Sequence, residues 1–177
     1  FWVNRNAKRK RPSDLLWAWK LFLDKLHEKH GHKNATLLLH TDPRDQEGPN
    51  LLACAEHLDI VANVVFSTDR IEFEQMNIIH NIADVTTNIS YAEGFGLSTL
   101  EAMMTGTPIA AVTTGGQTRQ VIDHRDGTEN GVAFPVEFET LVGSQTVPYI
   151  KEDYCSVETI SEGWLKLYDM GPSGRKK

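Results

Sequence analysis

The stretch from Ser90 to Met103 reads Ser-Tyr-Ala-Glu-Gly-Phe-Gly-Leu-Ser-Thr-Leu-Glu-Ala-Met. It follows a strand-type run at 84–87 and opens a helical pattern at about Gly96. Gly94 and Gly96 leave backbone N–H groups uncovered where the helix begins, and the helix dipole makes that end positive. The stretch therefore predicts a phosphate-binding turn between a strand and a helix.

Two carboxylates flank this turn, Glu93 on the loop and Glu101 in the first turns of the helix. A carboxylate is a poor phosphate ligand because the two groups carry like charge. It is a good acceptor for hydroxyl groups, so the two side chains suit sugar hydroxyls on either side of a diphosphate. The alternative is a plain tight turn with solvated or capping glutamates, and the position between a strand and a helix favours the functional interpretation.

Strand-type runs and helical patterns alternate along most of the chain. Short apolar runs predict strands at the start of the chain (1–3) and at 36–40, 64–66, 84–87 and 108–112. A 3.6-residue period of apolar positions predicts helices at 14–29, 72–83 and 156–169, the first with Ser13 as its N-cap. This order predicts an α/β fold, a Rossmann-like parallel sheet with helices on both faces. Ligands bind such sheets at the carboxyl ends of the strands, here the loops at 5–12, 40–48, 66–71, 88–96 and 113–117.

The chain has 177 residues, of which 40% are hydrophobic and 24% charged, a composition typical of a globular protein with its own core. We expect one domain over 1–170, with 156–169 as its C-terminal helix and 171–177 as a tail. Because the chain begins with Phe1 in a strand-type run, we expect it to be a piece of a longer protein. No apolar run reaches the roughly 20 residues of a membrane span. A cytoplasmic location is expected, with peripheral attachment to a membrane left open.

The charge is unevenly distributed. The net charge is −6, yet the first eleven residues contain only basic charged groups, Arg5, Lys8, Arg9, Lys10 and Arg11. An acidic chain with one basic segment is unsuited to general nucleic-acid binding, so no nucleic-acid partner is expected. The basic segment is better suited to binding one small anion. The alternative is that its charged side chains are simply solvated.

Several other sites are weighed and set aside. His27, His30 and His32 lie close together in the sequence, but no fourth metal ligand accompanies them, and we expect solvated side chains near a helix end. The chain contains no P-loop, no Gly-x-Gly-x-x-Gly and no Gly-x-Ser-x-Gly sequence. No Asp-x-Asp sequence occurs either.

Three segments resemble the motif of glycosyltransferase family 4, whose members are retaining enzymes with the GT-B fold. They are Glu93-Gly94-Phe95-Gly96, Glu101-Ala102-Met103 and Gly106-Thr107-Pro108. Further landmarks resemble the family in the same order, namely Arg5 with Lys10, Ala83-Asp84-Val85, Ser90, Gly115-Gly116 and Asn130-Gly131-Val132. The resemblance spans roughly residues 1–168.

The resemblance implies the C-terminal, donor-binding half of a GT-B glycosyltransferase, with the N-terminal acceptor domain outside this chain. Arg5 and Lys10 would then bind the diphosphate, with Lys8 as an alternative to Lys10. Glu93 would be the catalytic residue that accepts hydrogen bonds from the donor sugar, and Glu101 would accept them from the ribose. The backbone of Gly94, Phe95, Gly96 and Leu97 would approach the phosphates and the sugar, and the loop at Ser67 would face the base.

The implied substrates are a GDP-, UDP- or ADP-sugar and a glycan, lipid or other hydroxyl acceptor, with no cofactor and no metal. Asn4 and Arg11 replace glycines that usually flank the basic pair, and His40-Thr41-Asp42 replaces a glycine-rich turn. These departures leave the base and the sugar open. Two other functions stay open as well: a non-catalytic nucleotide-binding module, and a sugar-nucleotide epimerase or phosphorylase on the same fold.

Overall fold

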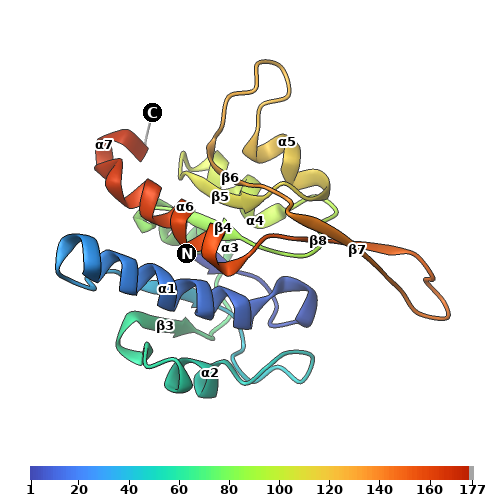
Figure 1. Ribbon diagram of the computed structural model, residues 1–177, viewed down its shortest axis with the longest axis horizontal. Coiled ribbons are helices and arrows are strands. Elements are labelled where there is room, and N and C mark those ends of the chain that lie inside the picture. Colours follow the sequence, from blue (N-terminus) through green and yellow to red (C-terminus); the bar gives the residue numbers. More distant parts are fainter. Residues whose placement is uncertain (176–177) are drawn as a thin grey trace.

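Two three-stranded parallel sheets form the centre of the computed structural model, which describes residues 1–175 (Figure 1). One sheet contains β1 (Trp2–Val3), β2 (Leu37–His40) and β3 (Val64–Ser67), and the other contains β4 (Thr86–Asn88), β5 (Ile109–Val112) and β6 (Gly131–Phe134). The Phe1 nitrogen donates to the Val85 carbonyl at 2.7 Å, and the Thr87 N–H donates to the Phe1 carbonyl at 2.8 Å. These bonds join β1 to β4, so the strands run in the order β3-β2-β1-β4-β5-β6 as a Rossmann-like arrangement.

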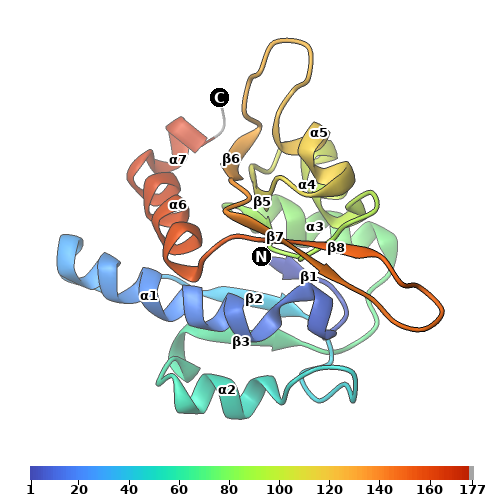
Figure 2. The same cartoon turned by 45° about the vertical axis from the view of Figure 1, so that its right-hand side comes forward.

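Helices cover both faces of the strands (Figures 1 and 2). On one face lie α1 (Pro12–His30) and α6 (Val157–Asp169), and on the other lie α3 (Phe73–Ile82) and α4 (Leu97–Met104). The remaining helices are short, namely α2 (Leu51–His57), α5 (Thr118–Val121), α7 (Gly171–Arg175) and the 3-10 turns η1 (Lys8–Lys10), η2 (Val61–Asn63) and η3 (Gly115–Gln117). The predicted α/β class, with helices on both faces of parallel strands, is confirmed.

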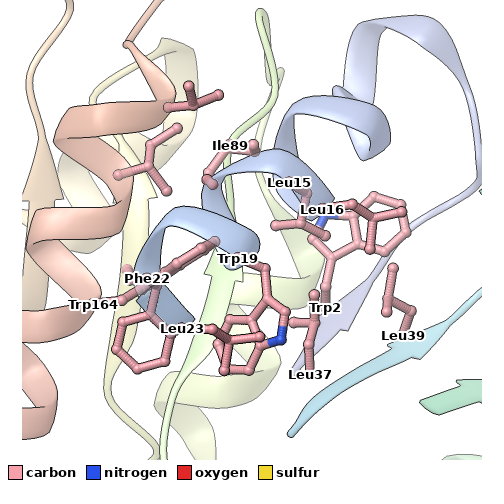
Figure 3. Packing of buried hydrophobic residues seen from close by; sticks show 14 of the residues in the cluster. Trp2, Leu15, Leu16, Trp19, Phe22, Leu23, Leu37, Leu39, Ile89 and Trp164 are labelled. Carbon is pink, nitrogen blue, oxygen red and sulfur yellow. The ribbon is translucent and has the colours of Figure 1, made fainter. Parts of the chain in front are cut away.

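The main hydrophobic core lies between the strands and the helices α1 and α6 (Figure 3). The Trp19 ring lies 4.9 Å from the Phe22 ring and 5.7 Å from the Trp164 ring, measured between centroids. Full burial of each such side chain stabilises the fold by about 1.5–3 kcal/mol. The 3.6-residue spacing of apolar positions in both helices is therefore the cause of their packing on each other.

The first helix begins differently from its prediction. Arg11 occupies the N-cap with a φ of 56°, and Pro12 is the first helical residue. Proline is suited to this position because its φ is already helical and its missing N–H is not needed there. Ser13 lies inside the helix, so its prediction as the N-cap is wrong.

The C-terminal part of the chain contains structure that the sequence did not predict. The strands β7 (Phe138–Val142) and β8 (Ile150–Tyr154) pair antiparallel and form a hairpin that projects from the body (Figures 1 and 2). The segment from Gly143 to Pro148, whose residue types predict a loop, is the turn of this hairpin. Residues 171–175 of the expected tail form α7, and residues 176–177 lie outside the described part of the chain.

Candidate functional site

A cleft of about 1010 Å³ lies at the carboxyl ends of β1, β4 and β5. Its walls are Val3 and Asn4 at the end of β1, residues 92–98 after β4, and residues 114–115 after β5. Side chains from η1, from α4 and from the β7–β8 hairpin complete it. Of the five loops expected at this edge, those at 5–12, 88–96 and 113–117 line the cleft, and those at 40–48 and 66–71 do not. A second cavity of about 730 Å³ lies at the amino ends of the strands and contains none of the motif residues.

The glycine turn, residues 93–97, forms one wall of the cleft. A second glycine turn, at Gly115-Gly116, packs behind it. Gly96 has a φ of 87° and is the N-cap of α4, where a Cβ atom would collide with the Thr99 hydroxyl. A Cβ atom on Gly115 or Gly116 would collide with the backbone of residues 93–95. The Gly116 N–H donates to the Glu93 carbonyl at 3.1 Å. The two turns thus pack backbone to backbone, and the N-terminal N–H groups of α4 lie at the cleft.

Lys10 and Glu93 meet at the cleft. Lys10 is only 6% exposed, and its Nζ donates a hydrogen bond to Glu93 Oε2. Burial lowers the pKa of Lys10, and the hydrogen bond and the charge of Glu93 oppose part of that shift. Lys8 is exposed on the same 3-10 turn and does not line the cleft, so the structure favours Lys10 as the lysine of the site.

Arg9 lines the cleft, whereas Arg5 does not. The Arg9 guanidinium lies 4.0 Å from Glu93 Oε2. The Arg5 side chain is 59% exposed and bonds to Asp45 at 2.8 Å and to Glu47 at 3.0 Å. The structure therefore does not bring Arg5 and Lys10 together, because an acidic loop 40 positions away binds the guanidinium. Sequence reasoning missed Arg9, which adjoins Lys10 in the basic segment.

Glu101 extends from α4 into the cleft and lies beside a buried histidine. Its side chain is about one-third exposed, and burial raises the pKa of its carboxyl group. His80 Nε2 on α3 lies 3.7 Å from Glu101 Oε2. The Phe95 and Leu97 side chains are exposed at the turn. Ser67 does not line the cleft, and its hydroxyl lies 3.0 Å from His40 Nδ1.

The hairpin contributes residues that sequence reasoning missed. Glu139, Lys151 and Asp153 line the cleft, and Lys151 donates to Glu139 at 2.9 Å. Neither 138–142 nor 150–154 alternates strictly between apolar and polar residues, so no two-residue period in the sequence marks the two strands. Only the three-dimensional arrangement brings them to the cleft, since the hairpin crosses back toward the loop after β4.

A stacked arginine fixes the base of the hairpin. The buried Arg11 guanidinium lies 4.7 Å from the Tyr91 ring centroid and 4.5 Å from the Tyr154 ring centroid. The Asp153 N–H donates to the Tyr91 carbonyl at 2.7 Å. An isolated two-stranded hairpin is marginally stable, so these contacts determine its position beside the glycine turn.

Within residues 1–175, the acidic, histidine and cysteine side chains form no metal site. No cluster of three or more His, Cys, Asp or Glu side chains there is arranged to hold a metal ion. In the histidine group, His30 Nε2 lies 2.9 Å from Asp169 and His32 Nε2 lies 3.4 Å from the Tyr168 hydroxyl. None of the helices of this part of the chain is long and apolar enough to cross a membrane.

Comparison with known proteins identifies similar chains. A D-inositol 3-phosphate glycosyltransferase 2 of Catenulispora acidiphila is 32% identical over 95 residues, which are 53% of this chain and 22% of that protein. The solved C-terminal domain of a glycosyl transferase group 1 family protein (LpcC) of Francisella tularensis superposes with a TM-score of 0.67 at 16% identity, covering 99% of this chain and 77% of that one. The Anabaena protein Alr3699/HepE, solved in complex with UDP, superposes with a TM-score of 0.65 at 17% identity, covering 99% of this chain and 41% of that one.

The match covers about a fifth of the length of that glycosyltransferase of Catenulispora acidiphila. The two solved structures share its fold, the GT-B type of domain predicted from the motif. The sequence profile of the glycosyl transferases group 1 matches residues 1–141, which include β1 and the whole glycine turn with both glutamates. The chain therefore belongs to the family of group 1 glycosyl transferases.

Proposed function

We propose that this chain is the donor-binding part of a retaining glycosyltransferase that transfers a sugar from a nucleotide diphospho-sugar to a hydroxyl acceptor. The observation that carries the proposal is the Lys10–Glu93 pair at the glycine turn that begins α4. It places a cation, a helix N-terminus and a hydroxyl acceptor within one cleft. The superposed LpcC structure is a C-terminal domain by its name, and its fold supports the assignment of this chain to the C-terminal half of such an enzyme.

The chemistry of the leaving group explains the cations. A nucleoside diphosphate gains negative charge as the bond to the sugar breaks, and groups already in place stabilise that charge best. Lys10, Arg9 and the N-terminus of α4 are such groups. In this proposal these groups stabilise the negative charge that a metal ion stabilises in other transferases.

Glu93 binds the sugar in the proposed complex. Its carboxylate accepts hydrogen bonds from sugar hydroxyls and fixes the ring, while Lys10 is shared between the carboxylate and a phosphate oxygen. Positioning of the ring lowers the barrier to an oxocarbenium-like transition state. Glu101, on α4, accepts from the ribose hydroxyls at the other side of the diphosphate.

Calorimetric titration of the full-length protein with GDP, UDP and ADP in the presence of EDTA tests the proposal. We expect one nucleoside diphosphate to bind, and Lys10→Met to weaken its binding about tenfold or more, as for a lost charge-assisted bond. Lys8→Met is the matched control, since Lys8 lies on the same 3-10 turn but outside the cleft. Absence of binding for all three nucleotides would contradict the proposal.

The transfer reaction itself needs a second measurement. The anomeric configuration of the product, read by NMR from the full-length protein, should match that of the donor sugar. An inverted product would remove the retaining assignment. Binding without transfer across donors and acceptors would instead support a non-catalytic nucleotide-binding module.

A further inference from the structure

Behind the cleft lies a buried polar group to which the proposed reaction assigns no task. His80 is in the last turn of α3 and is 1% exposed. Its Nδ1 lies 3.3 Å from the Thr86 hydroxyl oxygen, in β4. Its Nε2 is buried without a hydrogen-bond partner among residues 1–175. Such unpartnered buried groups are uncommon, and this one is 3.7 Å from Glu101 Oε2, at the edge of the cleft.

The surroundings of the ring decide which nitrogen carries the proton. Burial lowers the pKa of His80, so the imidazole is neutral near pH 7. The Thr86 hydroxyl can donate to Nδ1, whereas the Glu101 carboxylate can only accept. The opposite tautomer would set an imidazole lone pair against the carboxylate. The proton is therefore on Nε2, and the N–H points toward Glu101.

We propose that His80 is a positioning residue that holds the Glu101 carboxylate for the ribose of the donor. One carboxylate oxygen accepts from His80 Nε2–H, which leaves the other oxygen to accept from the ribose hydroxyls. The separation of 3.7 Å closes to a hydrogen bond by a small rotation of the glutamate side chain, as is common when a ligand fills a site. This inference rests on the proposed function, because it is the donor that supplies the ribose.

Contacts from the loop after α4 and from Phe1 hold the histidine in place for this role. The Thr107 hydroxyl donates to the His80 carbonyl at 2.6 Å, which ties the end of α3 to the loop after α4. The Phe1 ring packs edge-on against the imidazole at 5.2 Å. A long glutamate side chain loses rotamer freedom when it binds a ligand, and a fixed donor removes part of that cost beforehand.

The test compares a ribonucleoside diphosphate with its 2′,3′-dideoxy form in calorimetric titrations of the full-length protein. The nucleotide is the one of GDP, UDP and ADP that the wild type binds most tightly. His80→Met removes the N–H and keeps the apolar volume. We expect it to weaken the ribonucleotide about tenfold and the dideoxy form by less than twofold, because only the ribonucleotide uses Glu101.

Two further variants separate positioning from structure. His80→Gln carries an amide N–H near the position of Nε2 and should restore most of the ribonucleotide affinity. Thr86→Val removes the hydroxyl that fixes the tautomer and should weaken the ribonucleotide about threefold, which gives a second test if His80→Met does not fold. In the His80→Met/Glu101→Gln double variant, the two losses should not multiply.

The outcomes are distinct. Equal weakening of both nucleotides by His80→Met, or an unchanged ratio between them, would overturn the role of His80 and leave the donor site in place. Independent effects of the His80 and Glu101 substitutions would overturn it as well. If the wild type bound no nucleoside diphosphate, the proposed function and this inference would both be wrong.

Discussion

Lys10 Nζ donates a hydrogen bond to the Glu93 carboxylate, and this bond joins the 3-10 turn before α1 to the glycine turn before α4. The two residues lie 83 positions apart in the chain. Each belongs to a segment that follows a strand, β1 for Lys10 and β4 for Glu93, and the bonds between Phe1 and residues 85 and 87 make these strands neighbours. The junction of the two half-sheets is therefore what assembles the site.

Glu93→Gln should separate binding from catalysis. Removal of the carboxylate frees Lys10 for a phosphate oxygen, so nucleoside diphosphate affinity should stay the same or rise slightly. The transfer rate should fall by about a hundredfold or more, because the sugar ring loses a charged acceptor. Calorimetry and single-turnover transfer by the full-length protein measure the two effects. Glu162→Gln on α6, outside the cleft, is the control, and equal losses of affinity and rate would disprove the role on the sugar.

The fold was predictable where local patterns and topology agree. Local signals in the sequence mark several elements: a 3.6-residue apolar period marks α1 and α6, and apolar runs mark β2, β3 and β5. The alternation of strands with helices then predicts a parallel sheet. The β7–β8 hairpin gave no such signal, because its side chains are largely exposed and no core contact repeats every second residue. Its position depends on Arg11 between two tyrosines, a contact between segments more than a hundred residues apart.

The residues of the candidate site could be predicted within the motif at 93–101 and less well in the segments around it. Gly94 to Leu97, Glu93, Glu101 and Lys10 all line one cleft, since a glycine turn between a strand and a helix has few possible geometries. Arg5 was matched to the family because it precedes the other landmarks in the same sequence order. Sequence order does not show that Asp45 and Glu47 bind its guanidinium in the folded chain. Ser67 likewise bonds to His40, its neighbour on the adjacent strand.

The two arginines of the basic segment should contribute unequally to donor binding. Arg9 faces the cleft, and Arg5 is held by two carboxylates of the loop after β2. We expect Arg9→Gln to weaken nucleoside diphosphate binding about three- to tenfold and Arg5→Gln by less than twofold. Titrations at two salt concentrations would check that the Arg9 effect is electrostatic. A larger loss for Arg5→Gln would show that the loop releases Arg5 when the donor binds.

The hairpin should depend on Tyr154 for its order. Tyr154→Leu removes one face of the Arg11 stack and the ring that stacks on Phe138 at 4.5 Å. Loss of a partly desolvated cation–π contact and an aromatic pair predicts a decrease of about 1–3 kcal/mol in the free energy of unfolding. Hydrogen exchange over residues 138–154 should accelerate more than exchange in α1. Tyr149→Leu is the matched control because that side chain is 77% exposed at the hairpin turn, and equal effects of the two changes would contradict the anchor.

Glu101 should lower the stability of the protein near neutral pH. Burial raises the pKa of its carboxyl group, so the folded chain binds the proton more readily than the unfolded chain does. Its contribution to stability is therefore fully present below the unfolded pKa, about 4.3, and is lost as pH rises through the higher folded value. Glu101→Gln carries no charge, so we expect it to raise the melting temperature at pH 7 and to leave it nearly unchanged at about pH 4. Melting curves of both proteins between these two pH values measure the difference. An equal rise in melting temperature at pH 7 and at about pH 4 would mean that the substitution acts through packing and that burial of the carboxylate does not destabilise the fold.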